Sequence, residues 1–197
     1  MKIILASKSP RRREILTDLG FHFEIHTADT DESSSEQNPQ RLVEILAERK
    51  GNDVYKMFRS EDVLVISSDT VVSCDGRIMG KPRSYDEACE MLRYLSGRKH
   101  TVTSGLCLNM NGRIVTGHEN TDVYFANLTE EFIEKYVATG ETMDKAGGYA
   151  VQGIASMYIE KIDGCYFNVV GLPVRLLAKL LEQLGLDPCE LVVKKLK

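Results

Sequence analysis

Residues 2–16 read KIILASKSPRRREIL, and this stretch decides the fold class. Residues 2–6 are mostly apolar and predict a short buried strand. Ser9 is suited to the N-cap position of a helix and Pro10 to its first turn, and an isoleucine and two leucines then supply an apolar helical face. A strand, a tight loop and a helix in this order predict an α/β protein.

The rest of the chain also mixes strands with helices. Strands are expected at residues 21–28, with alternate residues facing the core, at 63–73, at 99–127 as a pair, and at 157–162 and 165–170 as a hairpin. Helices are expected around residues 42–50, 84–96, 129–139 and 173–184, the second of them starting with a capping box. Because several of these strands follow one another directly, some pairs must be antiparallel, and we predict a mixed sheet.

Composition narrows the class of protein. The 197 residues suffice for one substantial domain or one domain with two lobes, and a hydrophobic fraction of 43% with 27% charged residues is ordinary for a globular protein. A net charge of −4 argues against broad binding to nucleic acid or to an acidic membrane. We see no secretory signal, no run of 18 apolar residues, and five widely spaced cysteines that suggest reduced thiols. A cytoplasmic protein is expected.

The three consecutive arginines conflict with their position. The first turn of a helix carries partial positive charge, so Arg11, Arg12 and Arg13 are unfavourable there. A bound polyanion would remove this conflict, because unpaired N–H groups, the Ser7 hydroxyl and the arginine guanidinium groups all suit phosphate oxygens. The alternative is a solvated basic helix start whose arginines pair with surface acids.

Asp69 lies within VISSDTVV, residues 65–72, a run that predicts a buried strand. A carboxylate at such a place is unfavourable unless it is paired, hydrogen-bonded or metal-bound. It could be a strand-end acid satisfied by the neighbouring hydroxyls, or a general base or metal-linked acid aimed at water beside a phosphate. Asp31 and Glu32, in an acidic loop, could supply further oxygen ligands for Mg²⁺.

Three further polar residues are candidates for ligand contacts. Lys50 and Lys81 are, taken singly, most simply surface charges, although Lys81 lies in Gly-Lys-Pro just after the hairpin that contains Asp69. Gln152 lies between glycines that permit close backbone approach to a ligand. Its amide could match the edge of a uracil or thymine ring, or simply stabilise a turn.

Several motifs together resemble the Maf family. They are ASKSPRR, the DE of TDESS, LAERK, SSDTVV, GKP, MLRYLSG, DKAGGYAVQG and NVVGLP, in this order from about residue 3 to about residue 184. The resemblance implies a single domain over residues 1–197, an elongated α/β fold with a cleft between two lobes, related to inosine triphosphate pyrophosphatases. It also implies hydrolysis of nucleoside triphosphates to monophosphate and pyrophosphate with Mg²⁺ or Mn²⁺, and a homodimer.

The resemblance also implies roles for individual residues. Asp69 would be the proton acceptor and, with Glu32, a metal ligand. The residues implied to bind the nucleotide are Ser7, Arg11, Arg12, Lys50, Thr70, Lys81 and Gln152. Arg11, Thr70 and Gln152 stand where the branch that prefers dTTP and UTP has its selectivity residues, and Gly51 departs from the usual alanine. The alternatives are a 7-methyl-GTP pyrophosphatase and a non-catalytic nucleotide-binding regulator of cell division.

Overall fold

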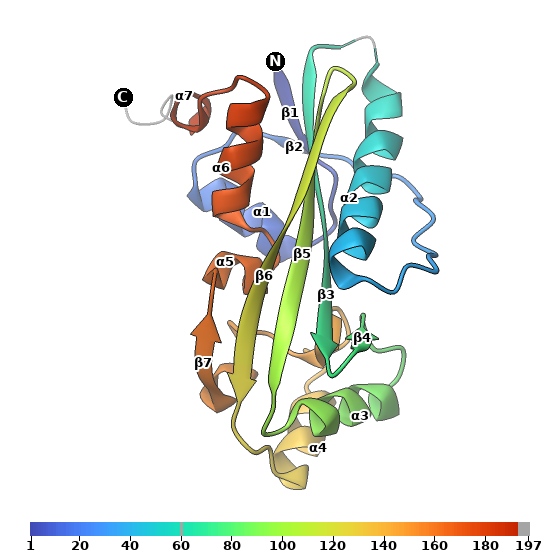
Figure 1. The fold of residues 1–197 in the computed structure, drawn as a ribbon, viewed down its shortest axis with the longest axis vertical. Coiled ribbons are helices and arrows are strands. Elements are labelled where there is room, and N and C mark those ends of the chain that lie inside the picture. Colours follow the sequence, from blue (N-terminus) through green and yellow to red (C-terminus); the bar gives the residue numbers. More distant parts are fainter. Residues whose placement is uncertain (60, 193–197) are drawn as a thin grey trace. The chain divides into compact units, whose positions relative to one another are not determined.

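The computed structural model describes residues 1–59 and 61–192, and Figure 1 shows their helices and strands. The strands of this part of the chain are β1 (Lys2–Leu5), β2 (Glu24–Ile25), β3 (Val63–Cys74), β4 (Arg77–Met79), β5 (Lys99–Met110), β6 (Arg113–Phe125) and β7 (Ile159–Asp163). The α-helices are α1 (Pro10–Asp18), α2 (Pro39–Tyr55), α3 (Tyr85–Leu95), α4 (Glu130–Ala138), α5 (Tyr166–Val170), α6 (Val174–Gln183) and α7 (Pro188–Val192). Short 3₁₀ helices are η1 (Lys56–Phe58), η2 (Ala146–Gly148) and η3 (Ile154–Tyr158).

The strands form a mixed sheet in the order β2-β1-β3-β5-β6-β7, with β4 paired to β3. β1 runs parallel to both β2 and β3, and Leu5 lies opposite Ile66. β4 pairs antiparallel with β3, and β7 pairs antiparallel with β6. The predicted α/β class with a mixed sheet is therefore confirmed.

The chain divides into two compact units. Unit 1 contains Met1–Asp69, Ser104–Glu119 and the described residues from Gly171 onward, and unit 2 contains Thr70–Thr103 and Asn120–Val170. Strands β3, β5 and β6 each contribute residues to both units. Asp69 is thus the last residue of unit 1 before the chain enters unit 2.

Each unit has buried apolar side chains of its own. In unit 1, β1 and β3 bury Ile4 and Val65 in one cluster with Val54 of α2. In unit 2, α3 buries Ala88, Leu92 and Leu95, and Ser84 caps this helix by accepting a hydrogen bond from Glu87 N at 3.1 Å. The sequence therefore predicted the start of α3 correctly.

The alternation over residues 21–28 gave a wrong strand prediction. Only Glu24–Ile25 is a strand, and it pairs with the last two residues of β1. Phe21 is buried, but Ile25, expected on the same inner face, is 44% exposed. Because β2 ends the sheet and pairs over two residues only, the period-two pattern does not extend to a buried face.

The expected hairpin over residues 157–170 is half correct. β7 forms, but it pairs with β6, and residues 166–170 form the helix α5 in place of a strand. Asn168 of α5 is fully buried, and its Nδ2 donates to Val102 O and to Thr121 Oγ1, both at 3.0 Å. These bonds fix the turn of helix against β5 and β6, and the aromatic pair before Asn168 is left exposed.

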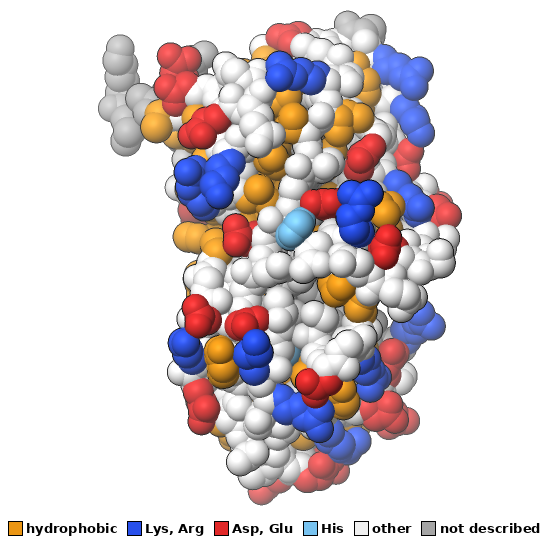
Figure 2. All heavy atoms as spheres, viewed as in Figure 1, with side chains coloured by type: hydrophobic (Ala, Val, Ile, Leu, Met, Phe, Trp, Pro, Cys, Tyr) orange, Lys and Arg blue, Asp and Glu red, His pale blue; other side chains and the backbone are white. Residues whose placement is uncertain are grey.

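The surface shows no extended region of a single charge on the face drawn in Figure 2, where lysine and arginine side chains alternate with aspartate and glutamate. Within residues 1–59 and 61–192, the helices all fall short of the length and apolar character needed to cross a bilayer.

Candidate active site

The loop after β1 brings a serine hydroxyl to the start of α1. Ala6 N donates to Ile66 O at 2.8 Å, so the chain stays paired to β3 beyond the end of β1. Ser7 Oγ then accepts a hydrogen bond from Ser9 N at 3.1 Å. Ser9 occupies the N-cap position and Pro10 the first turn, as predicted, although the Ser9 side chain makes no capping hydrogen bond. Since this first turn holds no acidic residue, the loop keeps the positive potential of a helix N-terminus.

Arg12 turns back into the protein. Its Nε donates to Gly171 O at 2.8 Å, and its Nη1 donates to Ser68 O at 2.6 Å and to Ser7 Oγ at 3.3 Å. Burial lowers the pKa of the Arg12 guanidinium from its ordinary value, and the negative charge of Asp69 opposes that shift. An arginine keeps its proton in proteins, so Arg12 places a positive charge beside Asp69.

Asp69 lies on the side of β3 that faces α2. Residues two apart on a strand share a face, and Ser67 Oγ donates to Ala47 O of α2 at 2.7 Å. Asp69 is therefore directed toward the same helix, where Lys50 stands three residues beyond Ala47. Lys50 Nζ lies 2.6 Å from Asp69 Oδ1, and the Asp69 side chain is 13% exposed. Taken singly, Lys50 was most simply a surface charge, whereas the structure pairs it with this half-buried acid.

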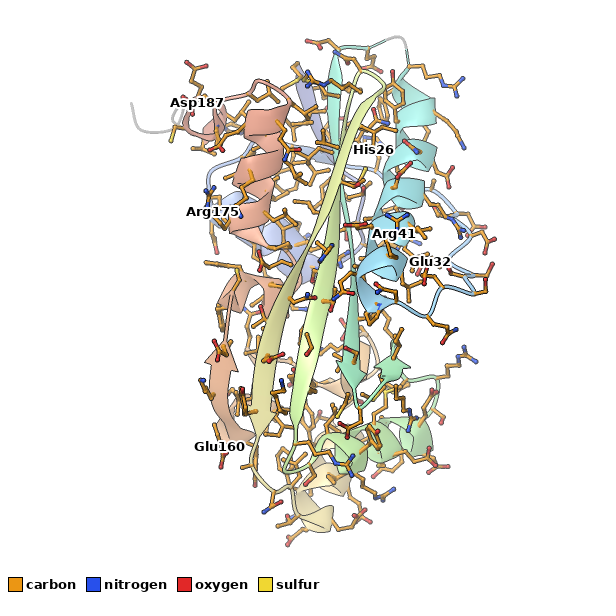
Figure 3. The ribbon with its side chains drawn as sticks, viewed as in Figure 1. His26, Glu32, Arg41, Glu160, Arg175 and Asp187 are labelled. Carbon is orange, nitrogen blue, oxygen red and sulfur yellow. The ribbon has the colours of Figure 1, made fainter. Side chains whose placement is uncertain are left out.

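Glu32 completes a charged triplet with these two residues. It lies in the loop between β2 and α2, beside that helix (Figure 3), and its Oε1 is 3.1 Å from Lys50 Nζ. Arg49 holds this loop, because its Nη1 donates to Ser33 O at 2.7 Å and to Asp31 O at 3.2 Å. These two carbonyls flank Glu32 in the chain, so Arg49 is a supporting residue that no sequence pattern distinguishes.

Asp31 is directed elsewhere. Its Oδ1 accepts a hydrogen bond from Ser33 N at 2.9 Å, and hydrogen bonding from Ser33 lowers the pKa of the Asp31 carboxyl. The Asp31 carboxylate therefore stabilises its own turn. Of the two acids that the loop offered as metal ligands, the structure brings Glu32 to Lys50 and Asp69.

The donor set suits a hard divalent cation. Carboxylate oxygens of Glu32 and Asp69 lie within 3.1 Å and 2.6 Å of the same ammonium nitrogen, that of Lys50. Among the described residues, no group of three or more His, Cys, Asp or Glu side chains could hold a metal by itself. Mg²⁺ is commonly held by one or two carboxylates together with substrate phosphates and water, and two carboxylates fit that pattern.

The three remaining predicted residues belong to unit 2. Thr70 follows Asp69 on β3 and is half-buried, whereas Lys81 and Gln152 are exposed. The segments that carry Lys81 and Gln152 are joined, because Gly147 N donates to Gly80 O at 3.0 Å. Unit 2 thus holds the Gly-Lys-Pro loop against the glycine-rich segment that precedes Gln152.

Buried polar residues support the Gln152 segment. His100 of β5 is 1% exposed, and its Nε2 lies 2.7 Å from the hydroxyl of Tyr149. Desolvation lowers the pKa of His100 to about 4, so the ring is neutral at physiological pH. Tyr136 Oη accepts from Ala150 N at 3.1 Å. Neither His100 nor Tyr136 could be predicted as a support, because a histidine and a tyrosine in apolar elements carry no distinguishing sequence pattern.

Comparisons with known proteins identify relatives over almost the whole chain. A family model described as "Maf-like protein" matches residues 2–184. A dTTP/UTP pyrophosphatase of Desulforamulus reducens is 48% identical over 188 residues, which are 94% of this chain and 97% of that protein. Proteins of the same name from Pyrococcus abyssi and Bacillus pumilus are 44% and 41% identical, cover 94% and 95% of this chain, and match over 97% and 98% of their own lengths. These matches confirm the resemblance drawn from the motifs.

A comparison with solved structures aligns the chain with the Ham1 protein of Staphylococcus aureus. It aligns over 100% of this chain and 96% of its own, with a TM-score of 0.48 and 12% sequence identity. A dITP/XTP pyrophosphatase of Mycobacterium abscessus aligns over 93% of this chain and 100% of its own, with a TM-score of 0.47 and 15% identity.

Proposed function

The chain belongs to the Maf family, and from that premise we propose that it hydrolyses dTTP and UTP to the nucleoside monophosphate and pyrophosphate. The observation that carries the proposal is the 2.6 Å contact between Lys50 Nζ and Asp69 Oδ1, at the end of the part of β3 that lies in unit 1. An acid in this position is partly exposed, paired and next to the loop that starts α1.

Unit 1 supplies the groups for phosphate chemistry in this proposal. Arg11 and Lys50 provide positive charge for the triphosphate, and Arg12 adds positive charge close to Asp69. Ser7 Oγ already accepts hydrogen bonds from Ser9 N and from Arg12, which leaves its proton as the group that it can donate to a phosphate oxygen. Such preorganised charges stabilise the transition state of phosphoryl chemistry more than the ground state.

Asp69 is the proposed proton acceptor. The attacking water passes its proton to the Asp69 carboxylate while its oxygen attacks the α-phosphorus, and the bond to the bridging oxygen breaks to release pyrophosphate. Pairing with Lys50 holds the carboxylate in one orientation for this role. General-base catalysis of this kind contributes on the order of 10²–10⁴ in rate.

A divalent cation, Mg²⁺ or Mn²⁺, is the proposed cofactor, and Glu32 and Asp69 are the residues that would hold it. When bound, it neutralises charge on the phosphate oxygens. Lys50 then contributes by keeping the two carboxylates close to each other, since its ammonium contacts both.

Unit 2 supplies the groups proposed to select the nucleotide. Gln152 is exposed on a segment that a backbone hydrogen bond, from Gly147 N to Gly80 O, joins to the Lys81 loop. A primary amide donates and accepts side by side, which matches the carbonyl and N–H groups on the edge of uracil and thymine. We assign Lys81 to phosphate charge and Thr70 to the sugar or base. A homodimer in the cytoplasm is likewise proposed, and equilibrium sedimentation at micromolar concentration tests the dimer.

The experiment is pyrophosphate release from a panel of triphosphates with Mg²⁺ and with Mn²⁺. The panel contains dTTP, UTP, CTP, dGTP, dATP and 7-methyl-GTP, and each is run with the wild type and with Asp69→Asn. We expect dTTP and UTP to be cleaved fastest, and the variant to lose at least about a hundredfold in kcat on both. Faster cleavage of 7-methyl-GTP would contradict the substrate assignment, and tight binding without turnover would contradict enzymatic function.

A further inference from the structure

Arg11 and Arg12 are neighbours at the start of α1, and the structure shows which acceptors the Arg12 guanidinium reaches. Both were expected to bind phosphate, yet Arg12 directs its Nε and Nη1 to acceptors of the protein itself. Two of these acceptors are backbone carbonyls, those of Ser68 and Gly171, at 2.6 and 2.8 Å. The third is the hydroxyl of Ser7, at 3.3 Å.

The two carbonyls lie where the chain passes between its units. Ser68 immediately precedes Asp69, the last residue of unit 1 before the chain first enters unit 2, and Gly171 is the residue at which the chain last returns to unit 1. A further bond joins them, because Ser68 Oγ donates to Gly171 O at 3.3 Å. Gly171 has φ +121°, a backbone conformation that side chains oppose, so the direction of its carbonyl depends on the absence of a Cβ.

We propose that Arg12 is a positioning residue, which orients Asp69 toward Lys50 by holding the Ser68 carbonyl. The planar guanidinium presents several N–H groups in fixed directions and can hold two carbonyls and a hydroxyl at once. A lysine at this position keeps the charge but cannot reproduce these directions. This inference rests on the proposed function, because Asp69 must be the group that acts on water.

The test compares Arg12→Lys with Arg11→Lys, since both variants keep the positive charge. Steady-state kinetics with dTTP give kcat and KM, and inhibition by pyrophosphate gives a separate measure of phosphate binding. Loss of orientation acts on the transition state, so Arg12→Lys should lower kcat by about tenfold or more and change KM by less than about threefold. For Arg11→Lys we expect KM and the pyrophosphate inhibition constant to rise about tenfold, because an interaction with the ground state is lost.

Two further measurements keep the inference falsifiable if Arg12→Lys is unstable. Gly171→Ala leaves both arginines in place but disturbs the carbonyl that Arg12 holds, and it should reproduce the fall in kcat with little change in KM. Hydrogen exchange followed by mass spectrometry should show faster exchange in peptides covering residues 66–69 and 168–172 in Arg12→Lys, and wild-type exchange there in Arg11→Lys.

The outcomes separate this inference from the proposed function. A wild-type protein that releases no pyrophosphate from any triphosphate refutes both. If the wild type is active, an unchanged kcat in Arg12→Lys with a raised KM and weaker pyrophosphate inhibition refutes the positioning role alone. Unchanged exchange at residues 66–69 in Arg12→Lys refutes it as well.

Discussion

Helix α2 lies so close to β3 at Gly51 that replacing this residue by alanine should destabilise the protein. A Cβ at Gly51 would stand 2.6 Å from Ser67 Oγ and 3.4 Å from Cys107 Sγ. The Ser67 side chain is fully buried, and its hydroxyl is held in place by donating to Ala47 O at 2.7 Å. Gly51 stands where the Maf pattern has alanine, so in this chain the Ser67 hydroxyl occupies the space that the alanine methyl would need.

Two opposing effects set the magnitude. Alanine in place of glycine inside a helix stabilises it by about 1 kcal/mol. The Cβ contact must lengthen from 2.6 Å to at least 3.0 Å, which moves the Ser67 hydroxyl away from Ala47 O. A buried hydroxyl left without its partner costs about 1–3 kcal/mol, and residual crowding adds to that. The net expectation for Gly51→Ala is a loss of roughly 1–2 kcal/mol.

The double variant Gly51→Ala with Ser67→Ala isolates the cause. Removing the hydroxyl leaves Ser67 Cβ as the nearest atom of that residue, at an ordinary 3.6 Å. The helix gain of about 1 kcal/mol then offsets the lost hydrogen bond of about 1 kcal/mol, so the double variant should have nearly wild-type stability. The free energy of unfolding is measured by urea titration for all four proteins. A Gly51→Ala protein as stable as the wild type, or two changes that simply add, would refute the steric argument.

Further predictions concern catalysis, the acidic loop and pH. Asp69→Asn should lose at least about a hundredfold in kcat for pyrophosphate release with unchanged circular dichroism, and near-wild-type turnover would exclude Asp69 as the base. Arg49→Ala releases the loop that carries Glu32, so half-maximal activation should need about tenfold more Mg²⁺. The control is Arg41→Ala, because Arg41 lies on the same helix (Figure 3) and forms an exposed ion pair with Glu44. This variant should need no more Mg²⁺ than the wild type. His100 takes up a proton below about pH 6.5 in the unfolded chain but only below about pH 4 in the folded protein. Neutral His100 therefore contributes fully to the free energy of unfolding above pH 6.5, and this contribution is lost as the pH falls toward 4. Urea titrations should show about 3 kcal/mol of pH-dependent stability that His100→Gln removes, and an unchanged pH profile in that variant would contradict this assignment.

Local patterns predicted the elements that present the site. The Ser-Pro signal marked the start of α1, and the β-branched run around Asp69 marked β3, because N-caps and strand patterns depend on neighbouring residues only. The pairing of Lys50 with Asp69 is a tertiary contact between residues 19 apart. The hydrophobic periodicity of a single helix or strand cannot predict which residues of two elements meet. The family resemblance placed both residues in one site, but it did not predict their ion pair.

The backbone carbonyls that accept hydrogen bonds from arginine side chains at the site could not be predicted from the sequence. Every residue carries a carbonyl, so nothing in the sequence distinguishes those of Ser68 and Gly171 as the partners of Arg12. The same holds for Arg49, which holds the acidic loop through carbonyls. The strand prediction for residues 166–170 was wrong for a related reason. The buried side-chain amide of Asn168 donates a hydrogen bond to a backbone carbonyl, and this contact favours a helix over the strand that the apolar run indicates.

The three arginines at the start of α1 therefore have a more specific explanation than one shared ligand. A cation at a helix N-terminus is unfavourable when its charge stays near the first turn. Arg13 is exposed to solvent, which screens its charge, and Arg12 carries its charge away from the helix to two carbonyls and the neighbourhood of Asp69. The local conflict is thus resolved inside the protein for Arg12, and by solvent for Arg13. An arginine-rich helix start is consequently a weaker sign of a polyanion than its charge suggests, because each guanidinium must first be traced to the acceptors that it reaches.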